Sequence, residues 1–109
     1  MHISTGKGKY HVWLEQQRIG PDFLFILGGG EKTHIGGIVI SEPNKPPTII
    51  RLGTHYDHHV LTPIIETARQ IYNTTIVAIG GIHIENASKE DINIITQNCQ
   101  EITDQINTL

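Results

Sequence analysis

Apolar and polar residues follow strand-like patterns through the first half of the chain. In residues 10–19, apolar positions such as Val12 and Leu14 alternate with polar or bulky ones, which is the period-2 pattern of a half-buried β-strand. Turn residues 20–22 follow, and residues 23–27 form a continuous apolar run of strand length. We therefore expect these two segments to form an antiparallel pair.

Three further strands are predicted downstream. Residues 35–40 and 48–52 are short apolar segments separated by a proline-rich turn. Residues 74–84 are rich in β-branched side chains, and Gly80-Gly81 inside them indicates a bulge or a close approach of the backbone. If the helix before this last strand makes a right-handed crossover, the strand runs parallel to residues 48–52.

Two helices complete the pattern. Residues 53–61 are predicted to form a loop, because a helix that began earlier would hold Pro63 in its interior at a cost of about 3 kcal/mol. Thr62 as N-cap and Pro63 as the first helical residue avoid this cost. The second helix starts with the capping-box sequence Ser88-x-x-Asp91. Its apolar stripe consists of Ile92, Ile95, Cys99, Ile102 and Ile106.

The order of elements is β-β-β-β-α-β-α, which predicts an α/β (α+β) fold of two layers. We expect a mixed, mainly antiparallel sheet of about five strands with two helices. A length of 109 residues fits a single domain, residues 1–109, with a flexible N-terminus over residues 1–8. Helices on one face leave the other face of the sheet open, so we expect a homodimer in which Trp13 helps to cover that face.

Composition narrows the classes of function. The net charge is −3 and the eight Lys and Arg residues are spread singly, so no basic stripe is present for nucleic acid. No apolar run reaches the roughly 20 residues of a membrane helix, and residues 1–9 lack the apolar core of a secretory signal. With one cysteine, no intrachain disulfide can form. We expect a cytoplasmic protein that binds neither nucleic acid nor membrane.

Seven histidines in 109 residues are the unusual feature of the composition. Antiparallel hairpins bring the end of residues 23–27, the start of 35–40 and the end of 48–52 to one edge of the sheet, and the last strand ends there too. Because a helix begins beside this edge, it suits a phosphate or another anion. The candidate binding residues are His34, Gly36, His55, His58, His59, Gly81 and His83. Surface loops are the simpler interpretation for His2, His11 and one of His58 or His59.

The sequence favours binding over chemistry at this edge. Residues 28–33 end in Lys-Thr, but Glu31 replaces the glycine that a Walker motif requires, and no Rossmann glycine pattern follows a strand. A metal ion stays open as a ligand, since residues 55–59 and His83 offer imidazoles and a carboxylate. Cys99 lies on the core stripe and no serine lies in a nucleophile elbow, so no covalent catalysis is indicated.

Two stretches, residues 19–38 and 48–92, resemble the prenylated-flavin chaperone family that includes the small D subunit of gallate decarboxylase. The most specific parts of the resemblance are His34-Ile35-Gly36 and Gly81-Ile82-His83. It implies a fold similar to that of the proteasome assembly chaperones. Carried over by motif, it also implies binding roles for His34, His55, His59 and His83.

The resemblance implies a protein with no reaction of its own. Such a chaperone binds prenylated FMN or FMN and passes it to a UbiD-type decarboxylase. Imidazole and N–H groups would hold the phosphate, and an apolar wall would hold the ring system. Two alternatives remain, a protein-assembly scaffold without a small ligand and a small metal-dependent enzyme built on the histidines.

Overall fold

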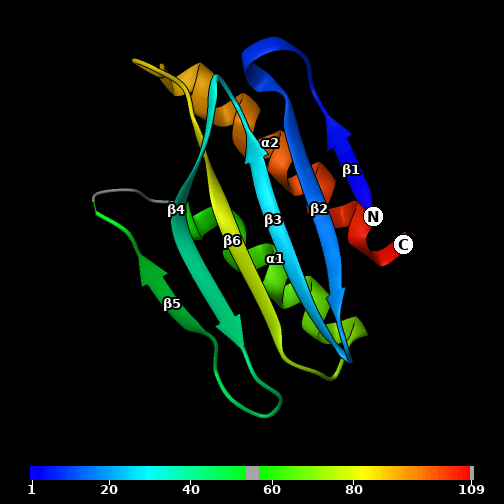
Figure 1. Ribbon diagram of the computed structural model, residues 1–109. Helices are drawn as coiled ribbons and strands as arrows, with labels where there is room; N and C mark the ends of the chain where they lie inside the picture. The colour runs from blue at the N-terminus through cyan, green and yellow to red at the C-terminus, as the bar shows by residue number, and fades with distance from the viewer. Residues whose placement is uncertain (54–56, 109) are drawn as a thin grey trace.

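The chain folds into two layers, a six-stranded sheet and two helices that cover one of its faces (Figure 1). The computed structural model describes residues 1–53 and 57–108. The expected α+β class is confirmed, with six strands in place of about five. In chain order the elements are β1 (His2–Thr5), η1 (Gly8–Tyr10), β2 (Val12–Ile19), β3 (Asp22–Gly29), β4 (Lys32–Ser41), β5 (Thr48–Arg51), α1 (His58–Ile71), β6 (Ile76–His83), α2 (Lys89–Gln105) and η2 (Ile106–Thr108).

The additional strand is β1, which pairs antiparallel with β2 at one edge of the sheet. The sequence predicts a flexible N-terminus over residues 1–8, and the structure instead makes His2–Thr5 part of the sheet. Its only apolar residue is Ile3, which packs against the core, so there is no alternation for a pattern search to detect. Backbone pairing with a neighbouring strand, a tertiary effect, orders the segment.

The strands are arranged in the order β1-β2-β3-β6-β4-β5. β6 lies between β3 and β4, parallel to β3 and antiparallel to β4. The expectation that this strand runs parallel to residues 48–52 is confirmed, because β6 and β5 are each antiparallel to β4, which lies between them (Figure 1). The end of β6 also reaches the expected edge, since His83 lies beside Gly30 and Lys32.

The hydrophobic core fills the space between the sheet and the two helices. Inward-facing side chains of β3 and β6, such as Phe25 and Ile76, are fully buried against Leu61 and Ile64 of α1. Cys99 of α2 is buried in the same core, as its place on the apolar stripe predicts. Burial raises the pKa of its thiol to about 12, so Cys99 is a packing residue and not a nucleophile.

The capping box predicted at the start of α2 is present. The Ser88 hydroxyl accepts a hydrogen bond from the Asp91 backbone N–H, and the Asp91 carboxylate accepts one from the Ser88 N–H, both at 3.0 Å. The same carboxylate accepts a hydrogen bond of 2.6 Å from the Tyr10 hydroxyl and lies 3.4 Å from Nζ of Lys9. These contacts, that of Tyr10 first, lower the pKa of Asp91 to about 2. Asp91 thus joins the N-terminal segment to α2.

The first helix begins at His58, about one turn earlier than expected, and therefore contains Pro63. The predicted loop is wrong for residues 58–61, and residues 54–56 lie outside the described part of the chain. The Thr62 hydroxyl donates to the His58 carbonyl at 2.7 Å, within the first turns of the helix. Leu61 is fully buried in this turn, so core packing offsets the cost of an interior proline.

Replacing Asp91 by Asn should destabilise the fold at neutral pH and progressively less in acid. A folded-state pKa of about 2 lies below the ordinary value of about 3.9, so the carboxylate stabilises the folded state above pH ~4 and loses this effect as the pH falls towards 2. Urea unfolding of both proteins from pH 6 down to pH 3 measures the difference. Asp104→Asn on the same helix, where the carboxylate is exposed, is the control. A gap in urea midpoint that stays constant over this range would contradict the assignment.

Candidate functional site

The carboxylate of Asp57 connects three elements at the histidine-bearing edge of the sheet. Asp57 directly precedes α1, and its side chain is only 11% exposed. Its Oδ1 accepts a hydrogen bond of 2.9 Å from the backbone N–H of Ile82 in β6. Its Oδ2 lies 3.1 Å from Nε2 of His34 in β4. The start of the helix is therefore held onto two neighbouring strands by one side chain.

Two glycines provide the space that this carboxylate occupies. A Cβ atom on Gly36 would collide with Oδ2 of Asp57, and one on Gly81 would lie 2.8 Å from its Cγ. Neither glycine has a positive φ, so the requirement is for space and not for an unusual backbone conformation. The β4–β6 ladder is irregular between Thr33 and Gly37, next to this point. Both predicted glycines thus lie against Asp57, and their structural role is to admit its carboxylate.

Two of the predicted histidines meet beside Asp57. The rings of His34 and His83 lie edge to face, with their centroids 6.1 Å apart. Nε2 of His83 is 2.9 Å from a carboxylate oxygen of Glu85, just as His34 is paired with Asp57. The expectation that strand ends far apart in sequence deliver histidines to one place is confirmed for this pair.

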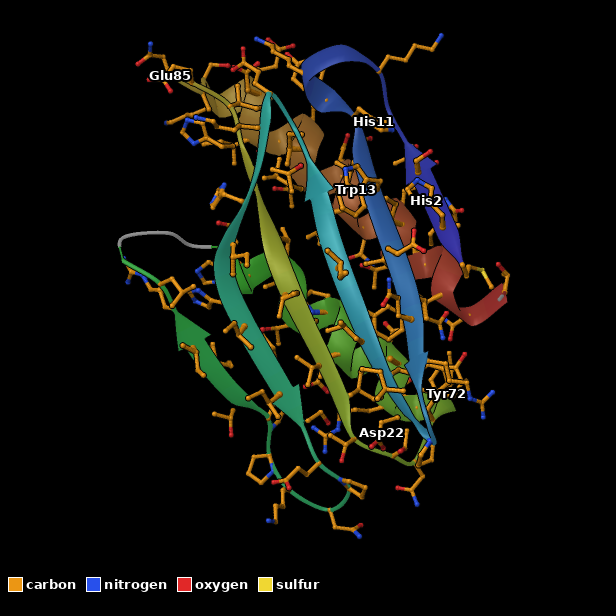
Figure 2. All side chains as sticks on the ribbon, viewed as in Figure 1. His2, His11, Trp13, Asp22, Tyr72 and Glu85 are labelled. Carbon is orange, nitrogen blue, oxygen red and sulfur yellow. The ribbon has the colours of Figure 1, made fainter. Side chains whose placement is uncertain are left out.

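The other histidines divide into two groups. His59, in the first turn of α1, lines the same cavity as His34 and His83, whereas His58 is not among its described lining residues although its ring lies beside that of His59. His55 lies outside the described residues. His2 and His11 lie by β1 and β2, towards the opposite edge of the sheet from β4 and so away from this group (Figure 2).

A cavity of about 400 Å³ opens next to the histidines, between the end of β6, the start of α1 and α2. Its size lies within the range of small-molecule pockets. The lining combines an apolar wall with a few polar groups. The residues are His34, Asp57, His59, Val60, Ile82, His83, Ile84, Ala87, Ile92, Ile95 and Thr96. Ile82 and Ile95 also pack against the core, which fixes this wall, while Ile92 is 55% exposed and marks the open side.

The charges around the cavity are not those of a simple anion site. None of the described lining residues is Lys or Arg, and the charged carboxylate of Asp57 lies beside the first turn of α1. Just outside, the Glu31 carboxylate accepts a hydrogen bond from the backbone N–H of Glu85. Within the described part of the chain, no group of three or more side chains could hold a metal ion. The arrangement suits an apolar or aromatic ligand whose polar edge can hydrogen bond to imidazole.

Sequence reasoning missed the central residue and part of the wall. The sequence indicates only a metal-ligand role for Asp57, because the expected helix start near Thr62 places it inside a loop. The signal that could have revealed this role is the acidic residue itself, because Asp57 directly precedes the first residue of α1, His58. The apolar stripe of α2 places Ile92 and Ile95 in the core. Ile95 does pack against the core and also lines the cavity, whereas Ile92 lines the cavity and is largely exposed.

The family profile of the prenylated flavin chaperone LpdD-like domain matches residues 6–109 of the chain. The match includes every element from η1 onward, and so the whole of the site. No curated protein matches the sequence. Among the described residues, no helix is long and apolar enough to cross a membrane.

The contact between Gly81 and Asp57 can be measured as a coupling free energy. Gly81→Ala should lower the free energy of unfolding by about 1–3 kcal/mol, because the new methyl group overlaps the carboxylate. In an Asp57→Ala background the same change should cost less than about 1 kcal/mol, since the obstacle has gone. Urea unfolding of the four proteins gives both values. Gly28→Ala is the control, because its Cβ would meet Trp13 instead; equal costs of Gly81→Ala in both backgrounds would refute the packing role.

Proposed function

We propose that this chain, which belongs to the prenylated flavin chaperone LpdD-like family, binds a flavin in the cavity between β6, α1 and α2. The cofactor in this proposal is prenylated FMN or FMN, and the receiving partner is a UbiD-type decarboxylase. The observation that carries it is the cavity itself, in which an apolar wall faces a group of imidazoles. A chaperone family implies an accessory protein that holds a cofactor and does not transform it.

The lining fits the ring system of a flavin. Isoalloxazine is a flat, largely apolar ring system with polar atoms along its edge, and a prenyl addition enlarges the apolar part. Ile82 of β6, Ile84 just after this strand and Ile95 of α2 offer apolar surface to such a ring. His34 and His83 supply hydrogen-bonding groups that fix its orientation. Since the wall is continuous with the core, the cavity is formed before the ligand arrives.

The face of the sheet without helices supports the proposal of a homodimer. Six aliphatic side chains form two rows across β3, β6 and β4 on this face, and all six are only half-buried. The rows are Leu24, Val77, Ile40 and Ile26, Ile79, Ile38. An apolar surface at the centre of a sheet is of the kind that a second copy of the chain can cover by face-to-face packing.

If this face is a dimer interface, light scattering of the wild type at micromolar concentration should return about twice the chain mass of 12.1 kDa. Ile79→Lys should return a mass near that of one chain, because a buried lysine at the centre of the interface is strongly unfavourable. Circular dichroism must show that the variant is folded, and Ile71→Lys at an exposed position of α1 is the control. A wild-type mass near 12.1 kDa would refute the dimer.

Flavin binding is tested by anaerobic titration with reduced prenylated FMN produced by a flavin prenyltransferase. His83→Ala should weaken binding by about ten- to a hundredfold, the effect of losing a hydrogen bond to a polar or charged group. The sequence predicts the same loss of flavin affinity for His55→Ala. The control is His2→Ala, because His2 pairs with Glu15 at the β1 edge.

The receiving enzyme is tested in the same series. The loaded wild-type chaperone should activate an apo-decarboxylase of UbiD type, and loaded His83→Ala should activate it less at equal protein concentration. If the wild type binds neither prenylated FMN nor FMN, the chaperone proposal fails and a protein-assembly scaffold becomes the better account.

A further inference from the structure

We infer that the cavity receives the ring system of the flavin and leaves its phosphate outside, and this inference rests on the proposed function. The reason is the fixed charge of the lining. A phosphate group carries negative charge, and the described lining presents the carboxylate of Asp57, paired with the His34 imidazole, and no Lys or Arg. Residues 54–56, which lie outside the described part, are Thr, His and Tyr and add no such cation.

The carboxylate cannot easily move away from an entering anion. Asp57 is held by the backbone N–H of Ile82 and by His34. It also fills the space that a Cβ atom on Gly36 or Gly81 would need. A phosphate placed in the cavity would therefore face a like charge that the fold keeps in position, in surroundings partly removed from water.

Two imidazoles that could have bound a phosphate already face carboxylates. His34 is paired with Asp57 and His83 with Glu85. Glu31 adds a further acidic side chain next to Glu85. A phosphate at these imidazoles would have to displace existing partners or accept repulsion from them, whereas a neutral ring edge can hydrogen bond beside them.

A basic side chain is available outside the lining. Lys32 is exposed and pairs with His83 across the β4–β6 ladder, but it is not among the described residues that line the cavity. The apolar wall, in contrast, continues to the open side at Ile92. These positions favour a ligand whose apolar end lies inside and whose anionic end lies in solvent. An exposed phosphate is also the part of the cofactor that a receiving enzyme can bind first.

The test compares reduced prenylated FMN with the same cofactor after removal of its phosphate by a phosphatase, the prenylated riboflavin form. Both are titrated anaerobically into the wild-type protein. We expect the two dissociation constants to agree within about tenfold, because a solvent-exposed charge contributes little to binding. A dephosphorylated form that binds more than about tenfold more weakly would overturn the inference while leaving the proposed function intact. Absence of binding by both forms would overturn both.

Asp57→Asn provides a second, independent arm. Asparagine keeps the shape of the side chain and an oxygen that can accept from the Ile82 N–H, but it removes the negative charge. With the phosphate outside, the substitution should change the affinity for both cofactor forms by the same factor. Selective tightening of the phosphorylated form by more than about tenfold would place the phosphate next to residue 57 and contradict the inference.

Discussion

The insertion of β6 between β3 and β4 is the constraint on which the rest of the molecule depends. Because β6 is parallel to β3 and antiparallel to β4, its last residue lies beside the turn that joins those two strands. This single arrangement buries Ile76 and Ala78 in the core, presents the Ile82 N–H to Asp57 and brings His83 to His34. It also gives the uncovered face of the sheet an apolar centre.

The site is built around a buried charge that the fold accommodates in detail. Burial of an unpaired carboxylate is unfavourable, and Asp57 avoids this cost through a backbone N–H and an imidazole. Gly36 and Gly81 lie on different strands, and both must lack a side chain for the carboxylate to fit. One residue thereby fixes the orientation of His34, the start of α1 and the sign of charge inside the cavity.

Much of the fold follows from local sequence patterns. Alternation and apolar runs identify β2, β3 and β6, and the Ser88-x-x-Asp91 pattern correctly gives the start of α2. β1 and the start of α1 could not be found in this way. The first depends on pairing with a neighbouring strand, and the second depends on the burial of Leu61 outweighing the cost of Pro63.

The candidate site was foreseen in part. His34 and His83 could be placed together because hairpins return strand ends to one edge of a sheet, a rule that requires no knowledge of side-chain contacts. The role of Asp57 could not, since the two glycines that admit it become neighbours only after β6 is inserted beside β4. The part of the apolar wall that α2 contributes could not be predicted, because the spacing of isoleucines along a helix is the same whether that face packs against a core or lines a cavity.

The central claim is that the flavin binds in the cavity at the end of β6. The most direct test is a titration of isotope-labelled protein with reduced prenylated FMN, followed by amide chemical shifts. The account predicts that the largest changes occur at Ile82, Ile84 and Ile95, which line the cavity. Changes concentrated instead at Ser41 and Asn73, in the smaller polar cavity at the opposite end of the sheet, would contradict it.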